Sequence, residues 1–230
     1  MSLTQSPRYM RDMVNEFDWL AHLKTSLLGQ DQLRCALSSL STQDMVAVAC
    51  LEKDVCHALV RLVDALPFRS ARPVTGSSTS LVFQDFQLCY EVPVTHALWS
   101  LAESLGQLFR AALSYGSLVE EPTAFRFNDL IVQRYPAGCR GISPHRDHAR
   151  YGVVVAILVL SGDGEFCVCQ NRTGEGAVEV PARPGDLVLM RAPGLRSAGP
   201  RPFHLLRNVT RYRRTVGLRY DVEKGPDGLK

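Results

Sequence analysis

The hydrophobic period of this sequence changes near residue 124, and that change constrains the fold more than any other feature. Before it, apolar residues recur at the three- and four-residue spacing of amphipathic helices. After it, short segments alternate every second residue and are separated by turns such as Pro136-Ala137-Gly138. Many short strands at close spacing are typical of a β-sandwich or a jelly roll. We therefore predict an α+β protein, with a jelly-roll core and N-terminal helices packed outside it.

Two regions follow from this pattern. Residues 1–120 are expected to form a mainly helical extension that carries substrate-lid elements, and residues 121–230 the core. Ser6-Pro7, Thr42 and Thr95 are predicted to begin three helices, and Pro67 to end the second. One strand is expected in the extension, at residues 86–92. The strands of the core are expected at residues 125–135, 153–160, 165–169, 177–180, 186–190, 204–209 and 214–220.

Composition narrows the class of protein. With 46% apolar residues, 230 residues suit one domain, or a core domain with an extension. The net charge of +3 neither requires nor excludes a nucleic-acid partner.

Seven scattered cysteines without a CxxC motif argue against a disulfide framework and a cysteine zinc site. The N-terminus has no signal pattern, and the longest apolar run is too short to cross a bilayer. We expect a cytoplasmic protein with no membrane partner.

The sequence His145-Arg146-Asp147 is a candidate for metal binding. On a strand, residues two apart point to the same side, so a histidine nitrogen and a carboxylate oxygen can converge on one ion. A third ligand, His204, lies 57 residues beyond Asp147, a spacing that can return a jelly roll to the same barrel mouth. Two histidines and one carboxylate leave three positions open on an iron ion. We predict that His145, Asp147 and His204 form a catalytic metal site.

Further motifs surround this triad in a fixed order. They are Gln133-Arg134-Tyr135-Pro136-Ala137-Gly138, then the HxD motif, then Pro184-Gly185-Asp186-Leu187-Val188-Leu189, then His204, then Arg213-Arg214-Thr215-Val216-Gly217-Leu218-Arg219. All of them lie within residues 125–220. In this order they resemble the Fe(II)- and 2-oxoglutarate-dependent dioxygenases, most closely the AlkB-like branch.

The resemblance implies an oxidoreductase that uses Fe(II), 2-oxoglutarate as cosubstrate, and O2. Arg213 would pair with the distal carboxylate of 2-oxoglutarate, and Tyr135 would donate a hydrogen bond to it. Thr215 could add a hydroxyl contact, and Arg219 would lie near the carboxylate that chelates iron. A dianion entering a partly buried barrel needs both charges compensated, and the arginine fork matches a carboxylate. Strand alternation directs Arg213 and Arg219 inward and Arg214 outward.

Several alternatives stay open at this point. Gln133 stands where the AlkB-like branch usually has asparagine, and the spacing from His204 to Arg213 is nearer to that of the prolyl-hydroxylase-like branch. The reaction is either hydroxylation of a C–H bond or oxidative demethylation of an N-methyl group. The substrate is a methylated nucleic acid, or a small molecule or peptide. A non-catalytic cupin-like binding module is the alternative outside enzymes, although it has no need of two inward arginines. His148 is expected to face away from Asp147.

Overall fold

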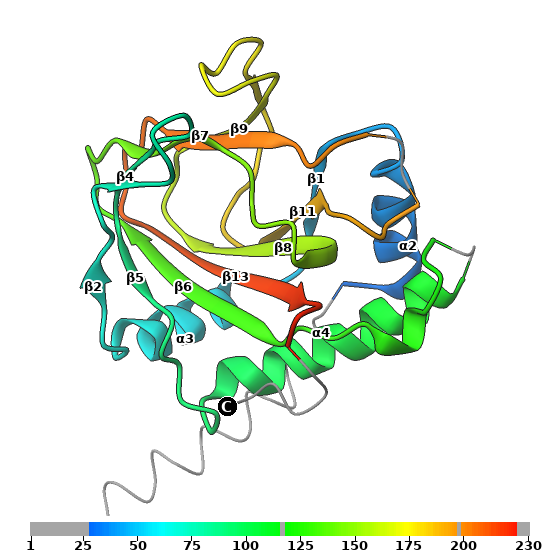
Figure 1. Ribbon diagram of the computed structural model, residues 1–230. Helices are drawn as coiled ribbons and strands as arrows, with labels where there is room; N and C mark the ends of the chain where they lie inside the picture. Colours follow the sequence, from blue (N-terminus) through cyan, green and yellow to red (C-terminus); the bar gives the residue numbers. More distant parts are fainter. Residues whose placement is uncertain (1–27, 116–117, 197–198, 225–230) are drawn as a thin grey trace, which may run out of the picture.

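The computed structural model describes residues 28–115, 118–196 and 199–224, and its strands form two antiparallel sheets that face each other (Figure 1). The larger sheet has the order β1 (Met45–Ala49), β11 (Asp186–Arg191), β8 (Tyr151–Ser161), β13 (Arg213–Asp221), β6 (Asp129–Tyr135), β5 (Gln87–Cys89), β2 (Arg69–Ser70). The smaller sheet has the order β10 (Val178–Glu179), β9 (Glu165–Cys169), β12 (Phe203–Arg207), β7 (Gly141–His145), β4 (Val82–Asp85), β3 (Val74–Thr75). The predicted jelly-roll core, which is a double-stranded β-helix, is confirmed.

Side-chain alternation along β8 divides the interior into two cores. Val154 and Leu158 face the helices α2 (Gln30–Ser39), α3 (Lys53–Asp64) and α4 (Ala97–Ser114), which pack on the outer face of the large sheet (Figure 1). Val155 and Val159 face the space between the sheets, with Phe166 of the small sheet. Leu158 is fully buried, and its replacement by alanine would cost on the order of 2–5 kcal/mol. The helices therefore support one wall of the barrel and leave its interior to the site.

The prediction for residues 42–66 is wrong in its first half. Met45–Ala49 is strand β1, which pairs with β11 at the edge of the large sheet, and the helix begins only at Lys53. The valines of this segment suit a strand that has a neighbour to pair with, and this partner lies about 140 residues away in sequence, beyond the reach of a local pattern. Strands β2 to β5 also come from the first 120 residues and join both sheets, so this region is less helical than expected.

The other element predictions need smaller changes. Helix α4 begins after His96, whose Nδ1 accepts a hydrogen bond from the backbone N–H of Leu98, so the cap lies one residue beyond Thr95. A short 3-10 helix (Pro122–Ala124) precedes β6, which starts later than predicted. The expected helix after Ser6-Pro7 lies outside the described residues. Among the helices of the described chain, none combines the length and apolarity that crossing a bilayer requires.

Candidate functional site

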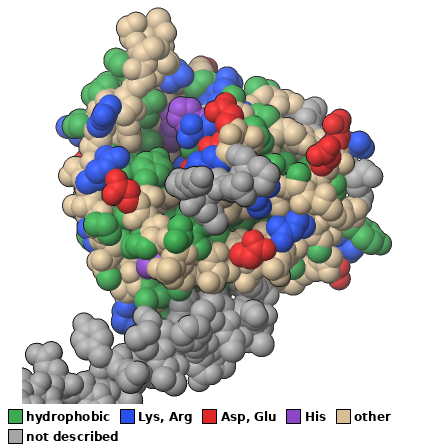
Figure 2. Space-filling model, turned by 60° about the horizontal axis from the view of Figure 1, so that its bottom comes forward, with side chains coloured by type: hydrophobic (Ala, Val, Ile, Leu, Met, Phe, Trp, Pro, Cys, Tyr) green, Lys and Arg blue, Asp and Glu red, His purple; other side chains and the backbone are tan. Residues whose placement is uncertain are grey.

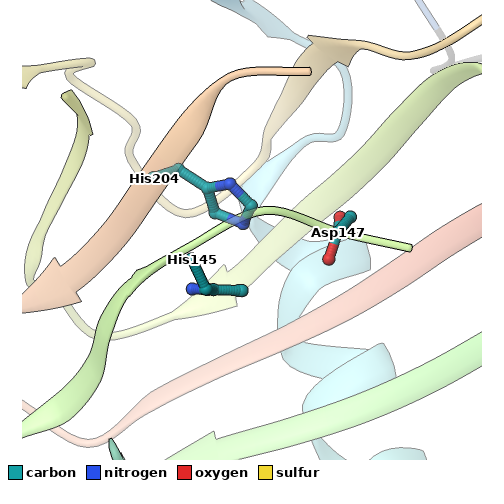
Figure 3. Close-up of side chains that lie close together, drawn as sticks. All are labelled: His145, Asp147 and His204. Atoms are coloured by element: carbon teal, nitrogen blue, oxygen red, sulfur yellow. The ribbon is translucent and has the colours of Figure 1, made fainter. Parts of the chain in front are cut away.

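The three predicted metal ligands come together at one end of the space between the sheets (Figure 3). His145 ends β7 and His204 lies on the neighbouring strand β12 as its direct register partner, with ring centroids 4.2 Å apart. Asp147 follows β7 by two residues. One ligand atom from each of the three lies within 4.8 Å of the others. These distances allow a single ion to contact all three side chains.

The position of Asp147 in this cluster does not result from strand alternation. Strand β7 ends at His145, so Asp147 belongs to the loop that follows and not to the strand. Arg201 donates a hydrogen bond to the backbone carbonyl of Asp147, which ties this loop to the segment just before β12. At the other end of β7, Gly141 has a φ of 75°, and a Cβ there would collide with the Leu206 carbonyl of β12. The close approach of β7 to β12 is what brings the two histidines together.

Backbone carbonyls orient both imidazole rings. Nδ1 of His145 lies 2.9 Å from the carbonyl oxygen of Ser143, and Nδ1 of His204 lies 3.4 Å from that of Pro202. A carbonyl can only accept, so Nδ1 is the donor in each ring and Nε2 keeps a lone pair for a metal. Such partners for the second ring nitrogen are usual among histidines that bind metals.

The charge states of the triad also suit a cation. Burial lowers the pKa of His145 to about 3, with a further contribution from neighbouring His204, and burial lowers the pKa of His204 as well. Burial raises the pKa of Asp147, but His204, Arg219 and His145 outweigh this effect and hold its pKa below the ordinary value. Two neutral imidazoles and one carboxylate are the protonation states in which these side chains bind metal.

A cavity between the sheets adjoins the triad and contains about 540 Å³ of space free of protein atoms, its open mouth included. The four residues that the sequence assigns to cosubstrate binding, Tyr135, Arg213, Thr215 and Arg219, all line it. Tyr135 lies on β6 opposite Arg213 of β13 in register, and the other two follow along β13 on the same face. The structure therefore places the predicted metal ligands and the predicted cosubstrate residues around one space.

Arg213 is a buried cation without a partner in the described chain. Its side chain is only 1% exposed, and neither Nε nor Nη1 has a hydrogen-bond acceptor. Burial lowers the pKa of its guanidinium, and electrostatic interactions with Tyr135 and Asp163 offset this only in part. Leaving buried donors unpaired costs about 1–3 kcal/mol, and more for charged groups. A cation held in this way at the wall of a cavity is suited to an anion that enters the cavity.

Arg219, by contrast, has partners within the protein. Its Nη1 donates to Asp129 Oδ2 at 2.9 Å and to the hydroxyl of Tyr151 at 3.1 Å, and Lys224 also bonds Asp129. Burial lowers the pKa of Arg219, but Asp147, Tyr151 and other neighbours outweigh it, so the pKa lies above its ordinary value. Sequence reasoning missed Asp129 and Tyr151. Asp129 could have been found only from the register of β6 against β13, where it faces Arg219.

The remaining predicted residues have simpler surroundings. Tyr135 is buried against Phe86, with ring centroids 4.8 Å apart, and burial raises the pKa of its phenol, so it is a neutral donor. The Thr215 hydroxyl lies 3.5 Å from Oε1 of Gln133. Arg214 points to the opposite face of β13, as predicted, where it forms two 2.7 Å hydrogen bonds with Asp64 of α3.

Comparison with solved structures places this fold among known proteins. A prolyl-4-hydroxylase from Pseudomonas putida has a TM-score of 0.57 at 18% identity, covering 82% of this chain and 98% of the other. An oxidoreductase of the 2OG-Fe(II) oxygenase family from Burkholderia pseudomallei has a TM-score of 0.58 at 14% identity, covering 87% of this chain and 94% of the other. The third is a prolyl hydroxylase from Trichoplax adhaerens in complex with a peptide fragment of the hypoxia inducible factor oxygen degradation domain. Its TM-score is 0.55 at 12% identity, and the match covers 91% of this chain and 93% of the other.

Sequence comparisons add no closer relative, because no protein-family model and no curated protein matches the chain. The structural likeness establishes the fold: the chain has the double-stranded β-helix architecture of 2-oxoglutarate- and Fe(II)-dependent oxygenases. The narrower expectation of an AlkB-like branch gains no support from these three structures.

Proposed function

We propose that this protein is an Fe(II)- and 2-oxoglutarate-dependent oxygenase. The observation that carries the proposal is a single cavity with a His-Asp-His cluster at one end and a buried, unpartnered arginine in its wall. A metal centre alone would not require Arg213, and an anion site alone would not require the triad. A non-catalytic cupin-like module would explain the histidines but not the buried guanidinium.

The residues present fit Fe(II). Two imidazoles and one carboxylate are the facial ligand set of non-haem iron oxygenases, and this set leaves coordination positions open for other ligands. The carbonyl partners of His145 and His204 keep Nε2 available in both rings. Arg201 holds the backbone of Asp147, so the carboxylate belongs to an ordered loop.

The residues present also fit 2-oxoglutarate. Arg213 would bind the distal carboxylate, because its Nε and Nη1 are donors that the described protein leaves without acceptors. Tyr135 would donate a hydrogen bond to the same group, and Thr215 would add its hydroxyl. Arg219 lies in the same wall, with Nε also unpaired, and would compensate negative charge near the metal.

When bound, iron and 2-oxoglutarate would supply the oxidising chemistry, in which O2 is reduced as the keto-acid loses CO2 to become succinate and the substrate gains an oxygen atom. The chain's own residues would fix geometry and charge. Arg213 and Tyr135 would orient the keto-acid, while the apolar side chains Val155, Ile157 and Phe166 would limit water inside the cavity. On a C–H bond the product is an alcohol. On an N-methyl group the hydroxylated carbon leaves as formaldehyde.

The test is binding followed by turnover. Anaerobic titration should show one Fe(II) per chain, and 2-oxoglutarate should bind only once metal is present. In air, the protein should slowly convert 2-oxoglutarate to succinate without added substrate, and N-oxalylglycine should compete. His204→Ala should abolish metal binding and succinate formation while leaving the circular dichroism spectrum unchanged. Metal-loaded protein that binds neither compound would contradict the proposal and favour the cupin-like module.

The narrower expectations of the sequence remain predictions within this proposal. An AlkB-like demethylase of nucleic acid and a small-molecule or peptide hydroxylase both use the same metal and cosubstrate. The 1–120 and 121–230 division and a cytoplasmic location are likewise predictions. What separates the two substrate classes is the surface around the mouth of the cavity.

A further inference from the structure

A groove rimmed with arginines lies outside the metal centre. It shares His145, Asp147 and Arg219 with the inner cavity and contains about 1510 Å³ of space free of protein atoms, open solvent included. Its walls come from distant parts of the chain. One wall holds Arg69 and Arg72, at β2 and just after it. The other holds Arg146, which follows β7, and Arg172, from the loop between β9 and β10.

These four arginines are exposed and lack ion-pair partners among the described residues. Arg146 and Arg172 lie over the ring of Phe203, at 4.0 and 5.6 Å from its centroid, a position that leaves the edges of their guanidinium groups free to bind an anion. Elsewhere in the described chain arginines often bind a carboxylate, as Arg207 binds Glu165 and Arg211 binds Asp163. Others, such as Arg61 and Arg140, are exposed and also have no ion pair, so the feature particular to this groove is that four such cations line one concave surface.

The groove carries little negative charge. Asp147 is the one carboxylate among the described residues that line it, and in the proposed enzyme this group faces the metal. Figure 2 shows histidine surface in a recess on one face of the molecule, with basic and acidic side chains beside it. A concave surface of one charge concentrates the field and attracts ligands of the opposite charge. The expected ligand is an anion that extends across both walls.

An exposed aromatic ring lies in the same groove. Tyr90 follows β5 and is 48% exposed, and it lines the groove together with the buried rings of Phe86 and Tyr151. A large apolar ring left in water beside cations is the combination found in grooves for single-stranded nucleic acid. There, arginines follow the phosphates while bases stack on aromatic faces.

From these observations we infer that the groove binds single-stranded nucleic acid, with phosphates against the four arginines, a base on Tyr90, and a neighbouring base directed toward the metal centre. This inference rests on the proposed function only for the step at the metal. An acidic peptide would satisfy the arginines too, but it would make no use of the exposed Tyr90 ring. The base at the metal would be the group that is oxidised.

Binding can be measured without activity. Full-length, metal-free protein is titrated into a fluorescein-labelled single strand of about 12 thymidines, a length in the range one groove covers, and anisotropy is followed at increasing KCl. The logarithm of the binding constant should fall against the logarithm of salt with a slope of roughly −2 to −3, as expected for about four phosphate contacts. A labelled polyglutamate peptide of similar charge serves as the competing ligand and should bind at least about tenfold more weakly.

Variants then locate the site. Arg72→Gln combined with Arg172→Gln takes one cation from each wall and should reduce affinity at least about tenfold and the salt slope by about 1.4. Tyr90→Ala should reduce affinity about tenfold with the salt slope unchanged, because stacking carries no counterion release. Arg183→Gln is the matched control, since Arg183 is exposed, has no ion pair among the described residues and lies outside the groove; it should change neither quantity.

The outcomes separate this inference from the proposed function. No binding of the oligonucleotide, tighter binding of polyglutamate, or equal losses for Arg183→Gln and the double variant would each overturn the nucleic-acid site. Succinate formation in the same preparation would leave the oxygenase proposal intact. Oligonucleotide binding with the predicted slopes but without any metal or 2-oxoglutarate binding would support the groove and contradict the oxygenase.

Discussion

The two buried arginines of β13 line one cavity and yet differ in their electrostatic surroundings. Arg219 contacts a carboxylate and a phenol of the protein, and its pKa lies above the ordinary value. Arg213 contacts no described acceptor through Nε or Nη1, and burial lowers its pKa. A buried charge that is neutralised internally supports the fold, while one that is left unneutralised costs stability until a ligand arrives. The comparison therefore assigns ligand binding mainly to Arg213.

The largest effect is expected where the internal pair is broken. Asp129→Ala leaves Arg219 buried without its carboxylate, which should lower the free energy of unfolding by about 3–5 kcal/mol. Urea denaturation of metal-free protein measures this change. Asp31→Ala, which removes the exposed partner of Arg34, is the control and should cost about 1 kcal/mol or less. Equal losses for the two variants would mean that the Arg219 pair has no special role in stability.

The next largest effect is expected on 2-oxoglutarate affinity when Arg213, the cation without a partner, is replaced. Arg213→Met keeps the side-chain length and removes the charge, so 2-oxoglutarate affinity should fall about a hundredfold while the metal-free protein keeps or gains stability. Arg213→Lys keeps the charge but loses the planar fork, and should weaken binding at least about tenfold. Calorimetric titration of 2-oxoglutarate into anaerobic Fe(II)-loaded protein measures both. If Arg213→Met lost stability but not affinity, the guanidinium would be structural.

A smaller change in affinity is expected at the paired arginine. Arg219→Lys keeps a cation beside Asp129 and Asp147, so 2-oxoglutarate affinity should fall less than about tenfold. Succinate formation should decrease more than affinity, since the altered group interacts electrostatically with the proposed metal ligand Asp147. Titration and a succinate assay on the same preparation distinguish the two effects. A larger loss of affinity here than for Arg213→Lys would reverse the assignment of the two arginines.

The smallest effect is expected on the outer face of β13. Arg214→Ala removes the bidentate contact with Asp64 and should cost roughly 1 kcal/mol of stability, because both side chains are partly exposed. The affinity for 2-oxoglutarate should stay within about twofold of the wild-type value. Titration beside Arg213→Lys measures the contrast. A large loss at Arg214 with none at Arg213 would mean that the inward face of the strand is the opposite one.

The strands and the inward arginines could be predicted because both depend on local alternation. Arg213, Thr215 and Arg219 lie at even spacing on one strand, so a two-residue period is enough to place them on one face. Strand β1 could not be predicted, because only its pairing with β11 favours it over a helix. The partner of Arg219 was missed for the same reason, since Asp129 meets it through a contact between residues 90 apart.

The sequence predicts which three residues form the candidate metal cluster, and the structure brings them together, but by a partly different geometry. His145 and His204 lie on neighbouring strands, but Asp147 reaches the cluster from a loop that Arg201 holds. A motif three residues long contains no information about where its strand ends. The arginines around the groove could not be predicted as a group from the sequence either. Arg69, Arg72, Arg146 and Arg172 are scattered along the chain and come together only in the fold.

The proposed metal and 2-oxoglutarate sites are tested most directly by a crystal structure of the protein grown anaerobically with Fe(II) and 2-oxoglutarate. We expect one metal ion bound by His145, Asp147 and His204. We also expect 2-oxoglutarate in the adjoining cavity, with its distal carboxylate on the guanidinium of Arg213 and the Arg219–Asp129 pair intact. A metal ion bound elsewhere, or 2-oxoglutarate whose distal carboxylate lies away from Arg213, would contradict this expectation.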